Sequence, residues 1–473
     1  MRLLSCPVLH VFVAFAIALL SPAYAREDVV VLTSYPEEVF SRFEAAFERA
    51  NPDIDIQFVW RMPHDALPSL RSDRNARIDV YWSPAYRNFI ALSDEGLLAV
   101  LDVDRTQLPG RAGPLQFSDP QGRYEGVEMA SFGIVSAPAT LAVHGLPIPR
   151  EWSDLADERF DGLVLFPIPS KVGFASTLVD GVLQSLGWRD GWSLLSRIAA
   201  FNRLIDGSGA FISDELRGGE AAVGLTIDFF ARSAIANGAP FVLTRPTANG
   251  YSFAHVGVLT HAAHPAAAHR FVAFLLSPEG QQLLGDADVA KLSVRPSSYQ
   301  DASAFGLSPF DAPDALALRY DPATGIARSL VVAALFDAMI TRRQPILRDA
   351  LRKLRRAEQA YAVRPDRAGR EAIEDATRHL EALPLNAEQA ADANLNRTFD
   401  ERRRGDPRAL ARAAEIEREW DRFFDVHTRA AATRLADIVG KDGTPPSPCS
   451  PLHVRAARPV VLRFGILVRY RFR

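Results

Sequence analysis

Hydroxyl side chains stand at three places where the sequence predicts that a strand ends and a helix begins. The residues at these places are Ser34 and Tyr35, Trp82 and Ser83, and Ser170, Lys171 and Gly173. The N-terminus of a helix offers unpaired backbone N–H groups and a partial positive charge, which together favour a carboxylate or a phosphate. We therefore predict that these residues line a binding site for an anion.

A plain helix cap is the alternative explanation for each of these hydroxyls. Ser34 stands three residues before Glu37, which is the spacing of a capping box, and Pro36 fits the first turn of the helix. Ser170 differs because Lys171 follows it. A cation beside a helix start attracts a bound anion, whereas a helix cap does not need one. Ser170 and Lys171 are therefore the stronger candidates for contact with a ligand.

The body of the chain lacks the motifs of common enzymes. It has no cysteine nucleophile, no Gly-x-Ser-x-Gly elbow, no His-Glu-x-x-His motif and no P-loop. His255, His261, His264 and His269 lie close in sequence, but we expect them on a strand, a turn and a helix start, in surface or packing roles. We therefore predict no catalytic residue, no metal site and no cofactor, and an enzyme is the least favoured class.

The N-terminus has the three parts of a secretory signal peptide. Met1–Leu4 is positively charged, Val8–Leu20 is almost entirely apolar, and Ala23–Ala25 gives an Ala-x-Ala end. The apolar run is shorter than the roughly 20 residues that cross a membrane. We predict a signal peptide over residues 1–25 that is cleaved to leave a periplasmic protein starting near Arg26, with an uncleaved anchor as the alternative.

The composition is typical of a large protein with its own hydrophobic core. Hydrophobic residues make up 48% of the chain and the formal net charge is −3, so global disorder and nucleic-acid binding are both disfavoured. Cys6 lies in the predicted signal peptide and Cys449 lies near the C-terminus. A secreted chain without a cysteine pair must be stable through its core, which excludes a disulfide scaffold.

The elements that must position the candidate residues follow a β-α-β order. Val29–Leu32 predicts a buried strand, residues 37–50 predict a helix with phenylalanines at helical spacing, and Ile54–Trp60 predicts a second strand. This order indicates an α/β fold with a parallel sheet covered by helices. From residue 325 to 435 the pattern is almost entirely helical.

Several segments, taken in their order along the chain, resemble the type 2 periplasmic solute-binding proteins of ABC transporters. The segments are Leu32–Pro36, Asp79–Pro84, Trp152–Leu155, Pro169–Gly173, Gly224–Phe230, Leu276–Gln281 and Leu292–Pro296. They are similar to the branch that holds ferric-ion, spermidine and phosphoglycerate binders. The last three segments and Ala334–Asp337 look most like the regulatory type found in phosphoglycerate transport.

The resemblance implies two α/β lobes joined by two extended crossovers, with the ligand held in the cleft between the lobes. We expect the crossovers near residues 128–135 and 251–258. The implied domains are a signal peptide over 1–25, lobe one over 26–128 plus 256–300, lobe two with the crossovers over 129–255, a helical extension over 301–439, and a linker with a basic tail over 440–473.

The resemblance also places Thr226, Asp228 and Phe229 in the cleft, at the end of a strand. Ferric binders of this branch carry two adjacent tyrosines there, and this chain has Phe229 and Phe230. Phenyl rings cannot supply the oxygen ligands that ferric ion prefers, so iron is disfavoured.

Two other solute classes remain to be weighed. Polyamine binders use carboxylates and aromatic rings, and Asp228 with Phe229 fits that use, but Lys171 argues against a cationic solute. Phosphate-binding relatives have a hydroxyl-rich run with Arg at the Ser170 position, whereas this chain has Ser170–Phe174 with Lys in place of Arg. A carboxylate, a phosphorylated anion or a less charged solute all remain open.

The favoured function is capture of a small organic or phosphorylated anion by a monomeric receptor, which delivers it to an inner-membrane ABC permease. The alternative is a ligand-sensing regulatory protein that acts with a membrane sensor kinase, for which the helical extension is a docking surface. The extension can also simply brace the lobes. We expect no nucleic-acid partner.

Overall fold

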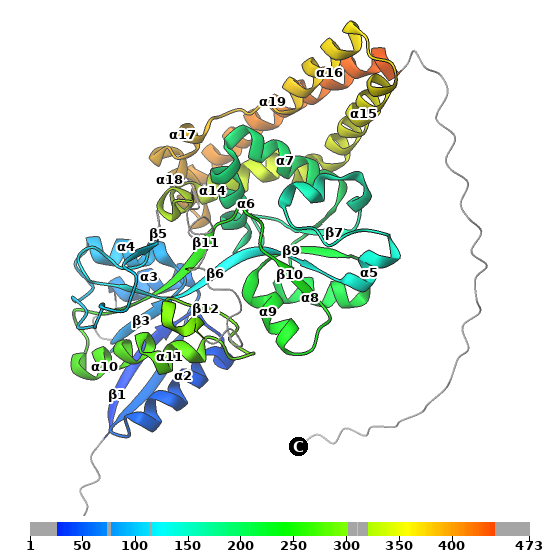
Figure 1. The fold of residues 1–473 in the computed structure, drawn as a ribbon. Helices are drawn as coiled ribbons and strands as arrows, with labels where there is room; N and C mark the ends of the chain where they lie inside the picture. Colours follow the sequence, from blue (N-terminus) through cyan, green and yellow to red (C-terminus); the bar gives the residue numbers. More distant parts are fainter. Residues whose placement is uncertain are drawn as a thin grey trace, which may run out of the picture.

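The computed structural model describes residues 26–72, 77–112, 115–207, 209–300, 310 and 320–439. The predicted signal peptide and the predicted tail after residue 440 lie outside the described residues. The described chain forms two α/β lobes and a helical region that follows them (Figure 1).

Lobe one is built on three parallel strands, in the order β2-β1-β3, as the β-α-β pattern predicts. The strands are β1 (Glu27–Thr33), β2 (Ile54–Trp60) and β3 (Val80–Ser83), and the helices are α2 (Glu37–Ala50), α3 (Pro63–Ser72), α4 (Tyr86–Asp94), α10 (Pro265–Leu276) and α11 (Pro278–Leu283). The apolar side chains of β1 and the phenylalanines of α2 enter one buried cluster. A two-stranded ribbon, β4 (Arg111–Ala112) with β5 (Leu115–Gln116), follows α4 along the chain.

Two long strands run from lobe one into lobe two (Figure 1). They are β6 (Glu125–Ser136) and β11 (Tyr251–Val258), which pair antiparallel with each other. All 12 residues of β6 are buried. Its first half also pairs with β12 (Leu292–Ser293), and its second half pairs with β9 (Val223–Ile227) of lobe two.

Lobe two continues the sheet in the order β6-β9-β7-β8. Its further strands are β7 (Val164–Pro167), β8 (Arg203–Ile205) and β10 (Val242–Thr244), and its helices are α5 (Pro138–Val143), α6 (Ala175–Leu186), α7 (Trp188–Phe201), α8 (Gly209–Gly218) and α9 (Asp228–Ala236). Short 3-10 helices cover Trp152–Ala156, Glu158–Phe160 and, in lobe one, Pro296–Tyr299.

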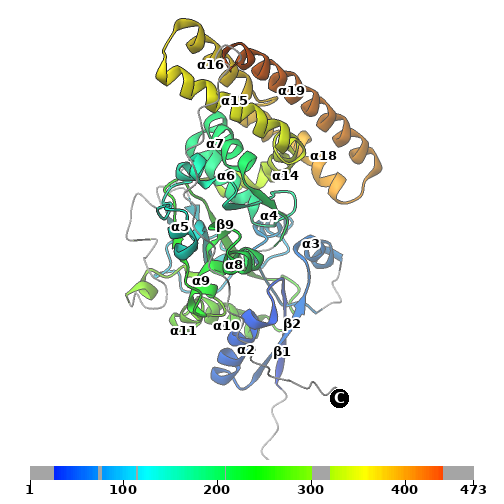
Figure 2. The same cartoon turned by 90° about the vertical axis from the view of Figure 1, so that its right-hand side faces the viewer.

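The helical extension stands on lobe two, and its far end projects away from both lobes (Figures 1 and 2). It consists of α14 (Pro322–Met339), a 3-10 turn (Thr341–Arg343), α15 (Gln344–Val363), α16 (Arg367–Leu380), α17 (Ala387–Ala390), α18 (Ala393–Arg403) and α19 (Pro407–Val439). α14 is its root, because Phe336 lies 5.4 Å from the ring of Phe166 in β7 and both belong to the core of lobe two.

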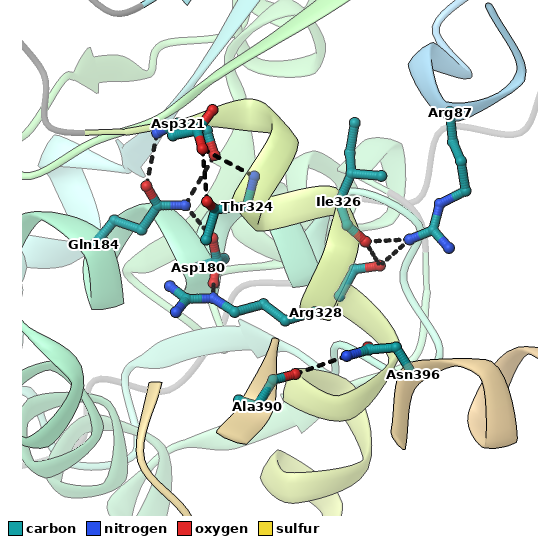
Figure 3. Close-up of polar contacts among 10 residues, drawn as sticks. Arg87, Asp180, Gln184, Asp321, Thr324, Ile326, Arg328, Ala390 and Asn396 are labelled. Carbon is teal, nitrogen blue, oxygen red and sulfur yellow. Dashed lines mark hydrogen bonds and ion pairs between the residues drawn. The ribbon is translucent and has the colours of Figure 1, made fainter. Parts of the chain in front are cut away.

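A buried ion pair fixes α14 to lobe two. Arg328 Nε donates to Asp180 Oδ1 of α6 at 2.6 Å, and both side chains are at most 5% exposed (Figure 3). One turn away, the backbone of Asp321 is bonded to the side chain of Gln184. The stretch Pro322–Val363 is long and apolar enough to cross a membrane, but 61% of its most apolar window is buried in the protein.

Two details of the sequence prediction are wrong. Ser34 does not cap α2, whose N-cap is Pro36 without a side-chain hydrogen bond. The helix expected to open at Ser170 begins instead at Ala175, because residues 169–174 form turns.

The buried His255 predicts how lobe one responds to acid. His255 stacks on Tyr86 at 4.5 Å, and neither of its ring nitrogens has a hydrogen-bond partner among the described residues. Burial lowers the pKa of His255 to about 3. Since the unfolded chain binds this proton more readily, the contribution to stability is present above pH 6.5 and is lost as the pH falls below it.

The wild type should lose free energy of unfolding between pH 7 and pH 5 because of His255. We expect this loss to be smaller in His255→Phe, by on the order of 2 kcal/mol. Urea denaturation at both pH values measures this loss. His144→Phe, at an exposed position on the same chain, is the control and should keep the wild-type pH dependence. If His255→Phe loses as much free energy of unfolding between pH 7 and pH 5 as the wild type, His255 does not control the acid sensitivity.

Candidate functional site

A cavity of about 580 Å³ lies between the lobes, and we call it the front chamber. Lobe one contributes Tyr35, Pro84 and Ala85. Lobe two contributes the segments around Lys171, Asp206 and Phe229, and the crossover strands contribute residues of β6 and β11. A ligand in this chamber therefore contacts both lobes, which is the condition for closure driven by a ligand.

A buried polar cluster of three residues lies at one wall of the front chamber. Tyr35 Oη donates to Glu128 Oε1 at 2.5 Å, and Lys291 Nζ forms an ion pair with the same oxygen. Glu128 and Lys291 are 3% and 5% exposed. Lys291 Nζ also lies 4.0 Å from the centroid of the Tyr35 ring, so the phenol packs against the cation as well as against the carboxylate.

The electrostatics of this cluster keep Tyr35 protonated. Burial raises the pKa of Tyr35 well above its ordinary value, and the neighbouring Glu128 carboxylate raises it further. Tyr35 is thus a hydrogen-bond donor to Glu128. Glu128 Oε2 is buried and has no hydrogen-bond partner among the described residues, although it belongs to a residue that lines the chamber.

Five aromatic rings also line the chamber. They are Phe132, Phe174, Phe229, Phe230 and Phe253. Lys171 and Asp206 are exposed, line the same chamber, and have no ion-pair partner among the described residues. The chamber therefore offers an apolar body with one free cation and one free carboxylate, while the charge of Lys291 is already met by Glu128.

The structure brings together four of the ten predicted site residues in the front chamber: Tyr35, Lys171, Gly173 and Phe229. Ser170 lies instead in a neighbouring cavity of about 670 Å³, the rear chamber, which Gly173 also lines. The backbone N–H groups of Lys171 and Val172 are bonded to the carbonyl of Ile168. These two N–H groups are therefore not available to an anion, and Lys171 can offer a donor to a ligand only through its side chain.

The other five predicted residues serve the packing of the lobes. Ser34 and Ser83 share a hydrogen bond between their Oγ atoms at 3.0 Å, and Ser83 Oγ accepts from the backbone of Ala85. Trp82 is 1% exposed, and its ring lies 5.1 Å from that of Phe43 in the core. None of these three residues lines the front chamber.

Thr226 and Asp228 are also buried away from the front chamber. Thr226 Oγ1 donates to the carbonyl of Ile227 at 3.2 Å. Asp228 accepts a hydrogen bond of 2.7 Å from Ser131 Oγ and lies 3.8 Å from Arg245. Its carboxylate therefore joins β6 to the start of α9 and is not offered to a polyamine.

Two residues of the polar cluster, Glu128 and Lys291, were not among the predicted site residues. A carboxylate inside the otherwise apolar run 126–135 was a usable signal for Glu128, because an acidic residue in a buried strand requires a partner. No local pattern marks Lys291, since its partner lies 163 positions away. Among the described residues, no group of three His, Cys, Asp or Glu side chains could hold a metal ion.

Comparison with known proteins agrees with this architecture. The family model described as bacterial extracellular solute-binding protein matches residues 82–306. The chain is related to the bacterial extracellular solute-binding proteins. The phosphoglycerate transport regulatory protein PgtC of Salmonella typhimurium is 26% identical over 420 residues, which cover 88% of this chain and 98% of PgtC. An uncharacterized protein of Haemophilus influenzae is 24% identical, over 64% of this chain and 88% of its own length.

Solved structures of solute-binding proteins share the two-lobed fold. The periplasmic binding protein AfuA of Actinobacillus pleuropneumoniae, with fructose-6-phosphate bound, matches with a TM-score of 0.52 at 19% identity, over 66% of this chain and 98% of AfuA. Iron-bound HitA of Pseudomonas aeruginosa also matches with a TM-score of 0.52, at 18% identity, over 65% of this chain and 99% of HitA. The fold is that of a two-lobed periplasmic binding protein.

The extents of these matches separate the lobes from the helical extension. About two thirds of this chain is enough to match AfuA and HitA over almost their whole length. The match to PgtC covers 88% of the chain, so it must continue well past the lobes into the extension. The extension is thus a feature that this chain shares with PgtC beyond the binding-protein core.

We expect Lys291→Met to lower the free energy of unfolding by about 3–5 kcal/mol, because it leaves the buried Glu128 carboxylate without its counter-charge. Urea denaturation followed by circular dichroism measures this loss. Adding Glu128→Gln to Lys291→Met should restore part of it. Lys353→Met is the matched control, because Lys353 forms a more exposed pair with Asp349 at 2.8 Å and should cost at most about 0.5 kcal/mol. Equal small losses for Lys291 and Lys353 would contradict this prediction.

Proposed function

We propose that this protein is the periplasmic receptor of an ABC-type uptake system and captures a small hydroxylated organic anion in the front chamber. One observation carries the proposal: the free cation of the chamber, Lys171, belongs to lobe two, while the buried cluster around Glu128 is built by lobe one and the crossover. An anion held by Lys171 against that cluster contacts both sides of the cleft only when the lobes are closed.

The chemistry of the wall supports an organic anion with hydroxyl groups. Lys171 supplies the charge for a carboxylate or a phosphate. Asp206 is the free carboxylate of the described lining, and it can accept a hydrogen bond from a ligand hydroxyl. The rings of Phe229 and Phe132 cover the carbon skeleton and remove water from these polar contacts.

The relatives point to the same chemical class. The name of PgtC refers to phosphoglycerate transport, and AfuA was solved with fructose-6-phosphate bound. Both compounds are hydroxylated and phosphorylated. A ferric ion is less suitable, because Phe229 and Phe230 offer no oxygen and Tyr35 is held in its protonated form.

A sensing role is the second candidate, and the helical extension favours it. PgtC is called a regulatory protein, and its match to this chain includes the extension. In this alternative the closed, ligand-bound receptor docks on a membrane sensor kinase instead of a permease. We favour uptake, with export by the N-terminal signal and action as a monomer. An enzyme is the least favoured class, because the family model that matches residues 82–306 describes solute-binding proteins.

We expect a thermal-shift screen to show stabilisation by hydroxy acids or their phosphate esters. At a hundredfold excess over Kd, the ligand should add about 2.7 kcal/mol to the free energy of unfolding. Polyamines and ferric citrate belong in the same screen. Stabilisation by ferric citrate with a red colour, and by no organic anion, would overturn the proposal.

We expect Lys171→Ala to weaken binding of the anion found in the screen by about tenfold, which corresponds to about 1.4 kcal/mol. Isothermal titration calorimetry measures the change. Lys353→Ala, on α15 of the extension, is the matched control and should bind like the wild type. Unchanged affinity in Lys171→Ala would remove Lys171 from the site.

Uptake and sensing differ in what the cell loses when the protein is deleted. Deletion in a strain that expresses the permease constitutively should abolish uptake of the radiolabelled anion if this chain is the receptor. Full uptake in that strain, with loss only of anion-dependent transcription, would establish the sensing role instead.

A further inference from the structure

The rear chamber is bounded by three parts of the molecule. Pro84–Arg87 of lobe one and residues of α14 and α18 of the extension line the chamber. Lobe two contributes Pro169, Ser170, Gly173, Ser176 and Thr177. The rear chamber shares Pro84, Ala85, Gly173, Thr177, Ser252 and Phe253 with the front chamber, so the two adjoin along the cleft. The extension therefore closes the far end of the interlobe space.

Arg87 reaches across this chamber from lobe one to the extension. Its Nη2 donates to the carbonyl of Ile326 in α14 and lies 3.3 Å from Ser329 Oγ (Figure 3). Because the Arg328–Asp180 pair fixes α14 to lobe two, Arg87 joins lobe one to a helix that moves with lobe two.

The other donors of Arg87 are available to a ligand. Its Nε and Nη1 atoms make no hydrogen bond to any described residue, and no described carboxylate lies within ion-pair distance of the guanidinium. Burial lowers the pKa of Arg87, which shows that the charge is partly removed from water. Each bidentate face of a guanidinium includes Nη2, which already contacts Ile326 and Ser329. The free Nε–H and Nη1–H groups point to different sides, so each can donate one charge-assisted hydrogen bond to an oxygen of a carboxylate or a phosphate.

The extension adds positive charge beside Arg87. Arg402 and Arg403 of α18 line the chamber. Arg402 is paired with Glu417 at 2.7 Å. Asp400 forms ion pairs with Arg403 at 3.1 Å and with Arg404 at 2.9 Å. The same carboxylate also interacts electrostatically with Arg87. The cations near Arg87 therefore outnumber the carboxylates.

An acceptor in the same chamber refines the class of ligand. Asp337 of α14 lines the wall, and its Oδ1 atom is buried without a hydrogen-bond partner among the described residues. A ligand that places a hydroxyl donor near Asp337 would satisfy this oxygen. Ser170 and Ser176 supply further hydroxyls on the lobe-two side.

We propose that the rear chamber is a second ligand site, which binds a small hydroxylated oxyanion through a free N–H group of Arg87. Either a carboxylate or a phosphate ester can occupy it, because the oxygens of both accept a charge-assisted hydrogen bond from a guanidinium N–H. The occupant joins lobe one, lobe two and the helical extension. This site goes beyond the proposed function and does not depend on which solute fills the front chamber, since Lys171 does not line the rear chamber.

Calorimetric titration separates the two chambers when it is performed in the Lys171→Ala variant. The probes are glycerate, glycerol 3-phosphate and inorganic phosphate, each up to 10 mM. We expect at least one of the two organic probes to bind Lys171→Ala, and Arg87→Gln in the same background to weaken that binding at least tenfold. Glycerate alone would identify a carboxylate site, and glycerol 3-phosphate alone would identify a phosphate site. Inorganic phosphate should bind more weakly than the preferred organic probe.

Matched variants control for folding and for charge. Arg49→Gln removes one exposed charge from α2 of lobe one and should leave binding unchanged. Ser329→Ala removes a partner of Arg87 without changing its free N–H groups and should also retain binding. If Arg87→Gln does not fold, Arg87→Met keeps an apolar stem without the donors and should show the same tenfold loss. Absence of organic-probe binding to Lys171→Ala, or equal binding with and without the Arg87 guanidinium, would overturn the rear site while leaving the front chamber tested separately by Lys171.

Discussion

The hydrogen bonding of strand β6 is the constraint on which the rest of the structure depends. Its first half pairs with β11 and β12, and its second half pairs with β9 and β10. Because one continuous strand serves both lobes, its pairing holds the two lobes in one sheet. The same strand carries Glu128 to the wall of the front chamber and Ser131 to the carboxylate of Asp228. The hinge and the site are therefore built from the same backbone.

A carboxylate in a buried strand is costly unless it is paired, and this cost explains the polar cluster of the cleft. Lys291 and Tyr35 meet Glu128 from two other segments of the chain. The charges of Lys291 and Glu128 compensate one another, and Tyr35 is neutral. The cluster therefore contributes shape and hydrogen bonding but little net charge. Under the proposed function, recognition of an anion is left to the exposed Lys171 of lobe two.

The helical extension changes what the two-lobed fold can do. Its root α14 is part of the lobe-two core, through Phe336 and the buried Arg328–Asp180 pair. Its only described hydrogen bonds to lobe one come from Arg87. A helical region that is fixed to one lobe and hydrogen-bonded to the other through one cation is placed to respond to closure, which is compatible with transport and with sensing.

The sequence by itself determined the fold class, because strand and helix periodicity and the order of the elements are local properties. It also identified Tyr35, Lys171, Gly173 and Phe229, which line the front chamber. It could not distinguish them from Trp82, Ser83, Thr226 and Asp228, since burial depends on what packs above a residue and not on its neighbours in the chain. Only the tertiary structure brought Lys291 to Glu128 across 163 positions and closed the rear chamber with α18, because long-range contacts leave no periodic signal in the sequence.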